Sequence, residues 1–152
     1  MSYVQQVLQP DETVRFRTTV HWSIYFVPII ALGVGLAFLV WHYMDQKANL
    51  LLLLGAIIFG ATGGVLALAA WLKQFGTEVA VTDQRVIYKR GLIRRHTVEM
   101  NLDKIESVDV DQSILGRFLG YGTITIRGTG QAVEPLRDMA DPLQFRSAIL
   151  AR

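Results

Sequence analysis

The sequence predicts a membrane α+β protein, in which a two-helix transmembrane hairpin is followed by an antiparallel β-barrel or sandwich with a C-terminal capping helix. Two observations predict the hairpin. Residues 23–44 and 50–72 contain no Asp, Glu, Lys or Arg, and each is long enough to cross a bilayer core, which needs about 20 apolar residues in a helix. The third observation is that, from residue 73 onward, apolar and polar residues alternate, which is typical of half-buried strands.

The chain is too short to hide both apolar segments inside a soluble core. It has 152 residues, of which 51% are hydrophobic, and a domain of this size could not surround two wholly apolar helices on all sides. The apolar segments therefore predict membrane spans. They divide the chain into a juxtamembrane, strand-like segment at 1–21, the hairpin at 22–72 and a β-rich domain at 73–152.

The charges around the spans predict the orientation. The polar connection at 45–49 is short, so the two spans must be antiparallel and both chain ends lie on one side. Arg15 and Arg17 precede the first span and Lys73 follows the second, whereas the connection offers only Lys47. The positive-inside bias therefore predicts a multi-pass protein of the cytoplasmic membrane with both termini in the cytoplasm.

Small residues recur along both spans. The second span has Ala56, Gly60 and Gly64 four residues apart, and the first has Gly33 and Ala37. This spacing allows helix backbones to approach closely in lipid. It is consistent with packing inside one hairpin and with contacts between subunits.

The β-rich part reads as a series of short strands and two helices. Strands are expected at 77–82, 85–91, 96–102, 105–110, 122–128 and 132–136. The segment around Val14 to Thr18 also alternates and could add a strand to the same sheet. Asp141 is expected to cap a C-terminal helix that has Pro142 at its first position.

Five glycines lie between residues 113 and 130, which raises the question of a phosphate-binding loop. No Lys-Ser or Lys-Thr follows them, and the next element is a strand rather than a long helix, so neither common phosphate motif fits. We expect instead a short helix capped by Asp111 and ended by a left-handed Gly120.

Three stretches of the β-rich part resemble a known family. "VTDQRVIYKRGLI", "LDKIESVDVDQSILGRFLGYG" and "IRGTG" resemble the bacterial pleckstrin-homology-like (PH) domain found in small membrane proteins of unknown function. The resemblance covers roughly residues 77–150, and the upstream pair of spans is also typical of that family. It implies a barrel-like sheet closed by a C-terminal helix and no particular reaction. Pleckstrin-like families serve in lipid headgroup binding, protein docking and ring-like self-assembly.

Three groups of residues are candidate contact sites. A basic hairpin could meet lipid headgroups or another subunit, or be only a solvated hairpin. An acidic segment follows it and could be the partner surface for that hairpin in the next subunit. An apolar group could cover the barrel core or contact a subunit or the bilayer surface. The groups are Arg85, Lys89, Arg90, Arg94 and Arg95; Glu99, Asp103, Glu106, Asp109 and Asp111; and Ile114, Leu115, Phe118 and Leu119.

The residues that carry catalysis are scarce. The chain has no cysteine, and His21 and His42 lie at opposite ends of the first span, while His96 lies among arginines. Asp109 and Asp111 could share a cation but more often such a pair is solvated. We expect no enzyme activity, no cofactor, no metal site and no nucleic-acid partner.

These observations favour a non-catalytic, membrane-anchored binding and assembly module at the inner face of the bacterial cytoplasmic membrane. We expect a homo-oligomeric scaffold or docking platform that contacts membrane lipids. An unidentified protein is a further candidate partner. The alternatives are an anionic-lipid-binding module and a small oligomeric channel or transport accessory protein.

Overall fold

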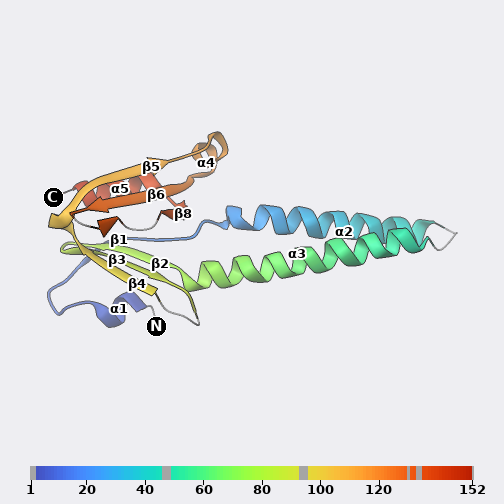
Figure 1. The fold of residues 1–152 in the computed structure, drawn as a ribbon, viewed down its shortest axis with the longest axis horizontal. Coiled ribbons are helices and arrows are strands. Elements are labelled where there is room, and N and C mark those ends of the chain that lie inside the picture. Colours follow the sequence, from blue (N-terminus) through green and yellow to red (C-terminus); the bar gives the residue numbers. More distant parts are fainter. Residues whose placement is uncertain (1–2, 46–48, 93–95, 130, 133–134, 152) are drawn as a thin grey trace. The chain divides into compact units, whose positions relative to one another are not determined.

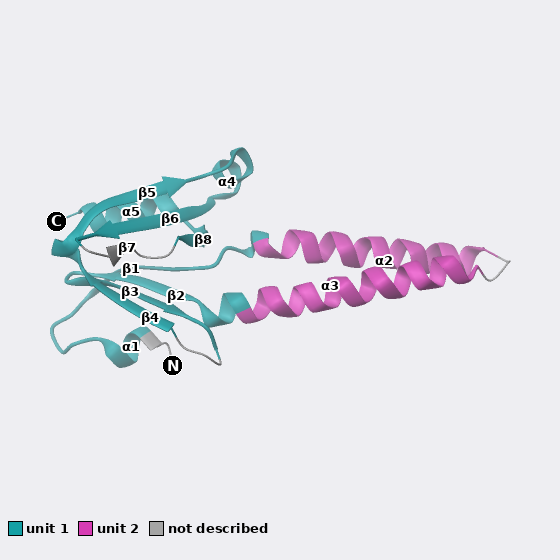
Figure 2. Cartoon of the chain, in the orientation of Figure 1, with its two compact units in different colours: residues 1–23, 73–152 teal, residues 24–72 magenta. Residues whose placement is uncertain are grey.

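A computed structural model describes residues 3–45, 49–92, 96–129, 131–132 and 135–151. The chain forms two compact units (Figure 2). The β-rich unit contains residues 1–23 and 73–152, and the helical unit contains residues 24–72. The segment before the first apolar helix thus folds together with the segment after the second.

The first sheet of the β-rich unit has four antiparallel strands in the order β1-β2-β3-β4 (Figure 1). They are β1 (Val14–Thr19), β2 (Glu78–Thr82), β3 (Arg85–Arg90) and β4 (His96–Asn101). The expected strand before the spans is confirmed, because β1 pairs with β2 along Phe16 to Thr19. Val79, Val81, Val86 and Ile87 are buried, as expected for β-branched residues on a covered sheet face.

The second sheet is built around β6. It contains β5 (Ile105–Asp111), β6 (Tyr121–Gly128), β7 (Gln131–Ala132) and β8 (Leu136–Ala140). β6 pairs with β5 on one side and with β7 and β8 on the other. The prediction of one strand at 132–136 was wrong. Pro135 lies just before β8 and has no N–H for a sheet ladder, so the strand is expected to be interrupted there.

The expected closed barrel does not form, because no continuous ladder joins the two sheets among the described residues. Along the chain they are linked by the 3-10 helix η2 (Leu102–Lys104). In space they meet at an isolated antiparallel bridge between Val20 and Met139. The backbone of Asp138 has a φ of 61°, which interrupts the extended conformation of β8 next to this bridge and explains why pairing stops after one residue.

The core of the β-rich unit lies where α5 (Pro142–Leu150) meets both sheets. The helix contacts β1, β2, β5 and β6, and Phe145 and Ile149 are buried. Phe145 packs edge-on against Phe16, with ring centroids 6.4 Å apart. Asp141 holds the predicted N-cap position, but it is left-handed and its side chain makes no capping hydrogen bond. A further helix, α1 (Tyr3–Val7), was not predicted; it packs against β2 and buries Val4.

The glycine-rich stretch forms the hairpin from β5 to β6 with the short helix α4 (Ile114–Leu119) at its tip. The predicted cap at Asp111 was wrong, because Ser113 is the N-cap and its Oγ accepts a bond from Gly116 N at 3.0 Å. Gly120 ends the helix with a φ of 77°, which confirms the predicted left-handed C-cap.

The helical unit consists of α2 (Phe26–Met44), entered through the 3-10 helix η1 (Trp22–Tyr25), and most of α3 (Leu50–Gly76). Both helices are long and apolar enough to cross a membrane. Most of their large apolar side chains are exposed rather than packed inside the unit, for example Val27, Ile30, Leu51 and Val65. This distribution is the opposite of that in the core of a soluble domain.

The two helices approach most closely at glycines. A Cβ added to Gly35 of α2 would lie 2.8 Å from the backbone N of Gly60 in α3, and one added to Gly63 would lie 2.8 Å from the side chain of Leu32. Ala56 is buried on this seam. Gly64, however, faces open space, so it has no place in the packing of the pair, and Gly63 lies on the seam instead.

Candidate functional site

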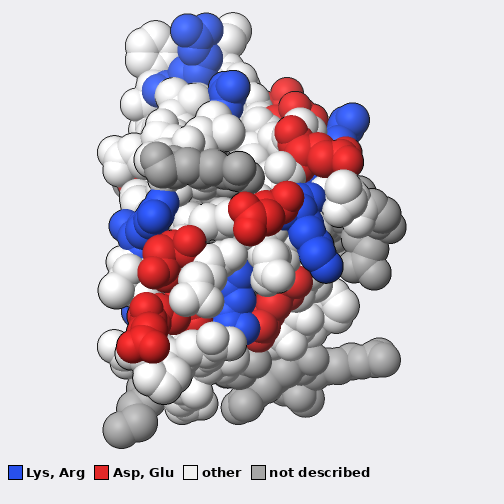
Figure 3. All heavy atoms as spheres, turned by 90° about the vertical axis from the view of Figure 1, so that its left-hand side faces the viewer, with Lys and Arg blue, Asp and Glu red and all other residues white. Residues whose placement is uncertain are grey.

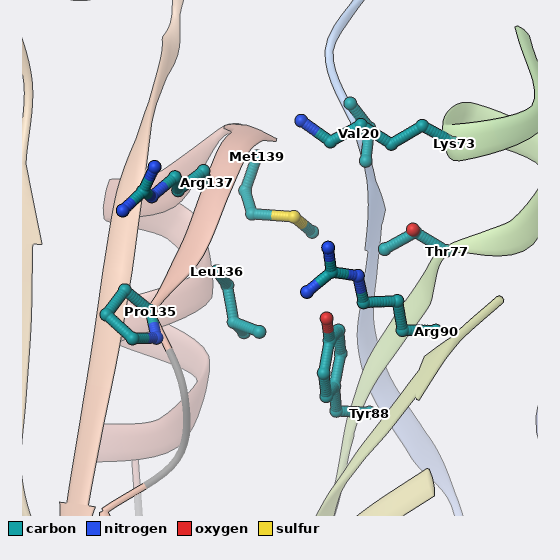
Figure 4. A pocket seen from close by; sticks show the side chains of 9 residues that line it. All are labelled: Val20, Lys73, Thr77, Tyr88, Arg90, Pro135, Leu136, Arg137 and Met139. Atoms are coloured by element: carbon teal, nitrogen blue, oxygen red, sulfur yellow. The ribbon is translucent and has the colours of Figure 1, made fainter. Parts of the chain in front are cut away.

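A cationic pocket of about 230 Å³ lies in the β-rich unit beside the Val20–Met139 bridge (Figure 4). Segments far apart in the sequence build it. They are the residue after β1, the last turn of α3, the residue before β2, the strand β3, and β8 with the proline before it. The lining residues are Val20, Lys73, Thr77, Tyr88, Arg90, Pro135, Leu136, Arg137 and Met139. The pocket therefore opens where the two sheets separate, which is the place that a closed barrel would fill.

The floor of the pocket is apolar and well packed. Val20, Leu136 and Met139 are each no more than 2% exposed. Thr77 and Tyr88 are also buried and bring the only hydroxyls of the lining. A ligand in this pocket would thus meet hydrocarbon at the bottom and hydrogen-bonding groups above it.

Three cationic side chains complete the lining, namely Lys73, Arg90 and Arg137. In Figure 4 the Arg90 guanidinium points toward the cavity and Lys73 extends toward it from α3, while the guanidinium of Arg137 points away from the cavity on the other side of β8. Lys73 Nζ is held 2.7 Å from Asp138 Oδ2, with both side chains partly exposed. No described carboxylate is among the lining residues, but the adjacent Asp138 offsets the charge of Lys73, so the net positive charge comes from the two arginines and favours an anionic group.

Local structure explains why β3 sends two side chains into the pocket. Tyr88 and Arg90 are two residues apart on β3, and side chains at this spacing point to the same face of a strand. Lys89 lies between them and points to the other face. Leu136 and Arg137, by contrast, are neighbours in β8 and both line the pocket, consistent with the irregular backbone at Asp138.

The predicted basic hairpin does not form one patch among the described residues. Arg90 lines the pocket, Lys89 lies on the opposite face of β3, and Arg94 and Arg95 lie outside the described residues. Arg85 is turned toward the N-terminal segment and is bound there. The described side chains therefore do not share one surface, and their contact with lipid or with another subunit stays a prediction.

Arg85 belongs to an ionic cluster that fastens the N-terminal segment to β2, β3 and β4. Its guanidinium donates to both carboxylate oxygens of Glu12, at 2.9 and 2.7 Å, and to Glu99 Oε2 at 2.7 Å. Thr82 Oγ1 adds a bond to Glu12 at 2.7 Å. Hydrogen bonding from Arg85 lowers the pKa of the buried Glu12 to about 2, and the same bond raises the pKa of Arg85.

The predicted acidic surface is likewise divided. Glu99 is bound by Arg85, and Asp109 lies 3.5 Å from Arg127 across the β5–β6 ladder. Asp103, Glu106 and Asp111 are exposed. In the view of Figure 3, acidic and basic side chains alternate over the surface rather than separating into two patches. This mixture gives little support to a docking of one charged stripe on another.

The predicted apolar group is mainly outside the core. Ile114, Leu115 and Phe118 are 76%, 64% and 84% exposed, and Leu119 is half-buried. The interpretation as core cover was therefore wrong for the first three. They project from α4 because Gly116, not a large residue, faces inward against the carbonyl of Tyr121.

Sequence reasoning found only Arg90 of the pocket as a candidate ligand-contacting residue. Lys73 contributed only to the predicted orientation of the spans, and Thr77, Tyr88 and Arg137 belong to no recognisable sequence motif. No local pattern could have joined them, since they come from elements that meet only in the folded unit. Among the described residues no group of three His, Asp or Glu side chains could hold a metal ion.

Comparison with known proteins identifies the family. No curated protein and no solved structure gives a significant match. The family model described as "Bacterial PH domain" matches residues 18–152. The match thus includes both apolar helices as well as nearly all of the β-rich unit, and the chain belongs to the bacterial PH domain family.

Proposed function

We propose that this chain is a membrane-anchored binding module whose cationic pocket takes the anionic headgroup of a lipid at the inner face of the bacterial cytoplasmic membrane. The observation that carries the proposal is the composition of the pocket, which has three cations and two hydroxyls over an apolar floor and no described carboxylate. A binding role agrees with membership of a PH domain family.

Membrane anchoring is supported by α2 and α3. Candidate spans run over Trp22–Met44 and Leu50–Gly76, and both have a mean hydropathy of 2.3. Arg15 and Arg17 precede the first span and Lys73 lies in the last turn of the second, all toward the chain ends, and this bias favours a cytoplasmic β-rich unit. Alkaline carbonate should leave the chain in the membrane, and protease added outside intact cells should not digest the β-rich unit.

Chain connectivity supports a position of the pocket close to the bilayer surface. Lys73 directly follows Leu72, the last residue of the helical unit, and Val20 precedes the first candidate span by two residues. Consecutive Cα atoms are about 3.8 Å apart, so neither lining residue can lie far from the point where a span leaves the bilayer. A phospholipid headgroup lies at this depth.

The pocket suits the headgroup end of an amphiphile. Its volume of about 230 Å³ equals that of roughly seven waters, which is enough for a phosphate and part of a glycerol. Arginine and lysine donate charge-assisted hydrogen bonds to phosphate oxygens. The apolar floor of Val20, Leu136 and Met139 gives a lipid an advantage over a free phosphate ion, which has no hydrocarbon to bury.

The test is ligand-induced thermal stabilisation of the full chain in a neutral detergent. Short-chain phosphatidylglycerol should stabilise the protein, whereas phosphatidylcholine with the same chains, inorganic phosphate and glycerol 3-phosphate should do so much less. In the Arg90→Gln/Arg137→Gln variant the affinity for phosphatidylglycerol should fall at least about tenfold, because a bond to a charged group is worth about 1.5–3 kcal/mol.

Arg146→Gln provides the matched control, since Arg146 is exposed on α5 and does not line the pocket. The proposal is wrong if both lipids stabilise the chain equally, or if the double variant keeps the response to phosphatidylglycerol. If glycerol 3-phosphate stabilises the chain as strongly as phosphatidylglycerol, the pocket still binds a ligand, but that ligand is a soluble phosphate ester rather than a lipid.

Self-assembly is a second candidate function, and the outer face of α3 favours it. An added Cβ would meet nothing within 4 Å at Gly64 of α3, so the backbone at this position is open to a close approach by another helix. We expect a homo-oligomer in mild detergent that Gly64→Ile dissociates and Val65→Ile, at an exposed position beside it, does not. A monomeric wild-type particle would exclude this scaffold role.

A further inference from the structure

An exposed apolar cluster, the apolar tip, stands at the end of the β5–β6 hairpin. It consists of Ile114, Leu115 and Phe118, of which Phe118 is 84% exposed. Three large apolar side chains on a helix of six residues are unusual on a surface in contact with water and mark an interaction site. Arg117 is exposed beside them.

The tip is held in a fixed conformation. Ser113 caps the helix, and Gln112 Nε2 donates to the Tyr121 carbonyl at 3.0 Å. A Cβ at Gly116 would lie 2.6 Å from the Tyr121 carbonyl oxygen, so this side of the helix is tightly seated on the hairpin. The seating leaves the three apolar side chains no inward orientation, so their exposure is built into the fold.

The base of the tip meets the segment that leads into the first apolar helix. Tyr121, the residue after the Gly120 cap, stacks on His21 with ring centroids 5.3 Å apart and an interplanar angle of 23°. His21 N donates to the Asp138 carbonyl at 2.6 Å, and Asp141 N donates to that of Gly120 at 2.9 Å. These contacts all lie within the β-rich unit and tie the tip to residue 21.

From this arrangement we infer that Ile114, Leu115 and Phe118 insert into the interfacial layer of the bilayer that the apolar helices cross. The inference rests on the proposed membrane anchoring. His21 is one residue before the candidate span at Trp22, and a six-residue helix extends only about 9 Å. The tip is therefore confined to the neighbourhood of the bilayer surface.

The side chains of the tip suit insertion into the bilayer interface better than binding in a groove of another protein. Apolar side chains with an adjacent cation are typical of segments that lie at the acyl–headgroup boundary, where Arg117 would meet lipid phosphates. Trp22 is 49% exposed at the same end of the unit, and tryptophan favours this boundary. Insertion gives the β-rich unit a membrane contact besides the helices, which would fix its tilt and the direction in which the cationic pocket faces.

The absence of native cysteine makes a site-directed spin-label test direct. Full-length Phe118→Cys in lipid nanodiscs is labelled, and its collisions with lipid-soluble oxygen and a water-soluble nickel complex are compared. We expect oxygen to dominate at position 118. Leu150→Cys is the aqueous control at the far end of α5, where Leu150 is 61% exposed, and Leu36→Cys is the control within α2. Ile114→Cys repeats the measurement if Phe118→Cys fails to fold.

Each outcome decides one point. A label at 118 as accessible to nickel as the label at 150 overturns the inference, provided that the label at 36 lies in lipid. A label at 36 that is itself aqueous overturns the membrane anchoring instead. Spin–spin broadening at 118 that disappears on dilution with unlabelled protein would show that a second copy, not lipid, covers the tip.

Discussion

The Glu12 carboxylate and the Arg85 guanidinium form a two-point ion pair, with Nε–Oε1 at 2.9 Å and Nη2–Oε2 at 2.7 Å. The pair joins residues 73 positions apart, one before the first apolar helix and one after the second. The Glu12 side chain is fully buried and that of Arg85 is 14% exposed. The pair thus closes the β-rich unit around the long insertion that carries both apolar helices.

Replacing Glu12 by Gln should destabilise the β-rich unit. Among the described residues the change leaves Arg85, in a mostly buried position, with Glu99 as its remaining charged partner, and breaking a buried pair in this way costs about 3 kcal/mol. Far-UV circular dichroism during thermal unfolding in mild detergent measures the loss. Asp11→Asn removes an exposed neighbouring charge and should have little effect; equal losses in the two variants would contradict a specific role for the pair.

Acid should weaken the same contact. Hydrogen bonds from Arg85 lower the pKa of Glu12 from 4.5 to about 2 in the fold, so the unfolded chain binds the proton more readily. The stabilising contribution is therefore complete above about pH 4.5 and is lost as the pH falls from there toward about 2. Unfolding midpoints measured over this range should fall more steeply for the wild type than for Glu12→Gln. Parallel curves would be evidence against this assignment.

His21 should contribute a second pH dependence at higher pH. Burial lowers the pKa of His21, against the opposing charge of Asp141, and its Nδ1 accepts a bond from Ser23 N at 3.1 Å. Because the neutral ring is favoured in the fold, this contribution is present above the ordinary pKa of 6.5 and is lost as the pH falls below it toward the lowered value. His21→Asn keeps an acceptor but cannot titrate, so its stability should not change over this interval.

A matched pair of glycines tests the seam between α2 and α3. Gly35→Ala places a Cβ 2.8 Å from the backbone N of Gly60, and neither backbone can move without separating the helices. We expect a loss of about 2 kcal/mol, as for other overpacked contacts. Gly33→Ala meets open space and should be neutral or slightly stabilising, since alanine favours a helix over glycine. Melting curves in detergent compare the two, and an equal response would show that the seam lies elsewhere.

The candidate site could be predicted from the sequence only in fragments. Arg90 was identified from its charge, but Arg85 in the same strand has the same charge and is bound internally. The two arginines differ in their surroundings. Arg85 binds Glu12, which lies 73 residues earlier, and Arg90 lines the pocket beside β8. The order of charges along the chain predicts neither of these surroundings. For the same reason the sequence left open whether Phe118 covers the core or makes an outside contact, since apolar pairs four apart fit a buried helix and a projecting one equally well.

The sequence by itself determined the elements of this protein. Charge-free runs of sufficient length specified two apolar helices, alternation specified most of the strands, and Gly120 and Asp141 marked helix ends, because each of these depends on residues a few positions apart. The tertiary structure alone decided that the sheets meet at one bridge between Val20 and Met139 rather than closing. That opening creates the pocket. It depends on how strands distant in sequence pack together, which is a balance between backbone pairing and side-chain burial. No pattern of neighbouring residues predicts this balance.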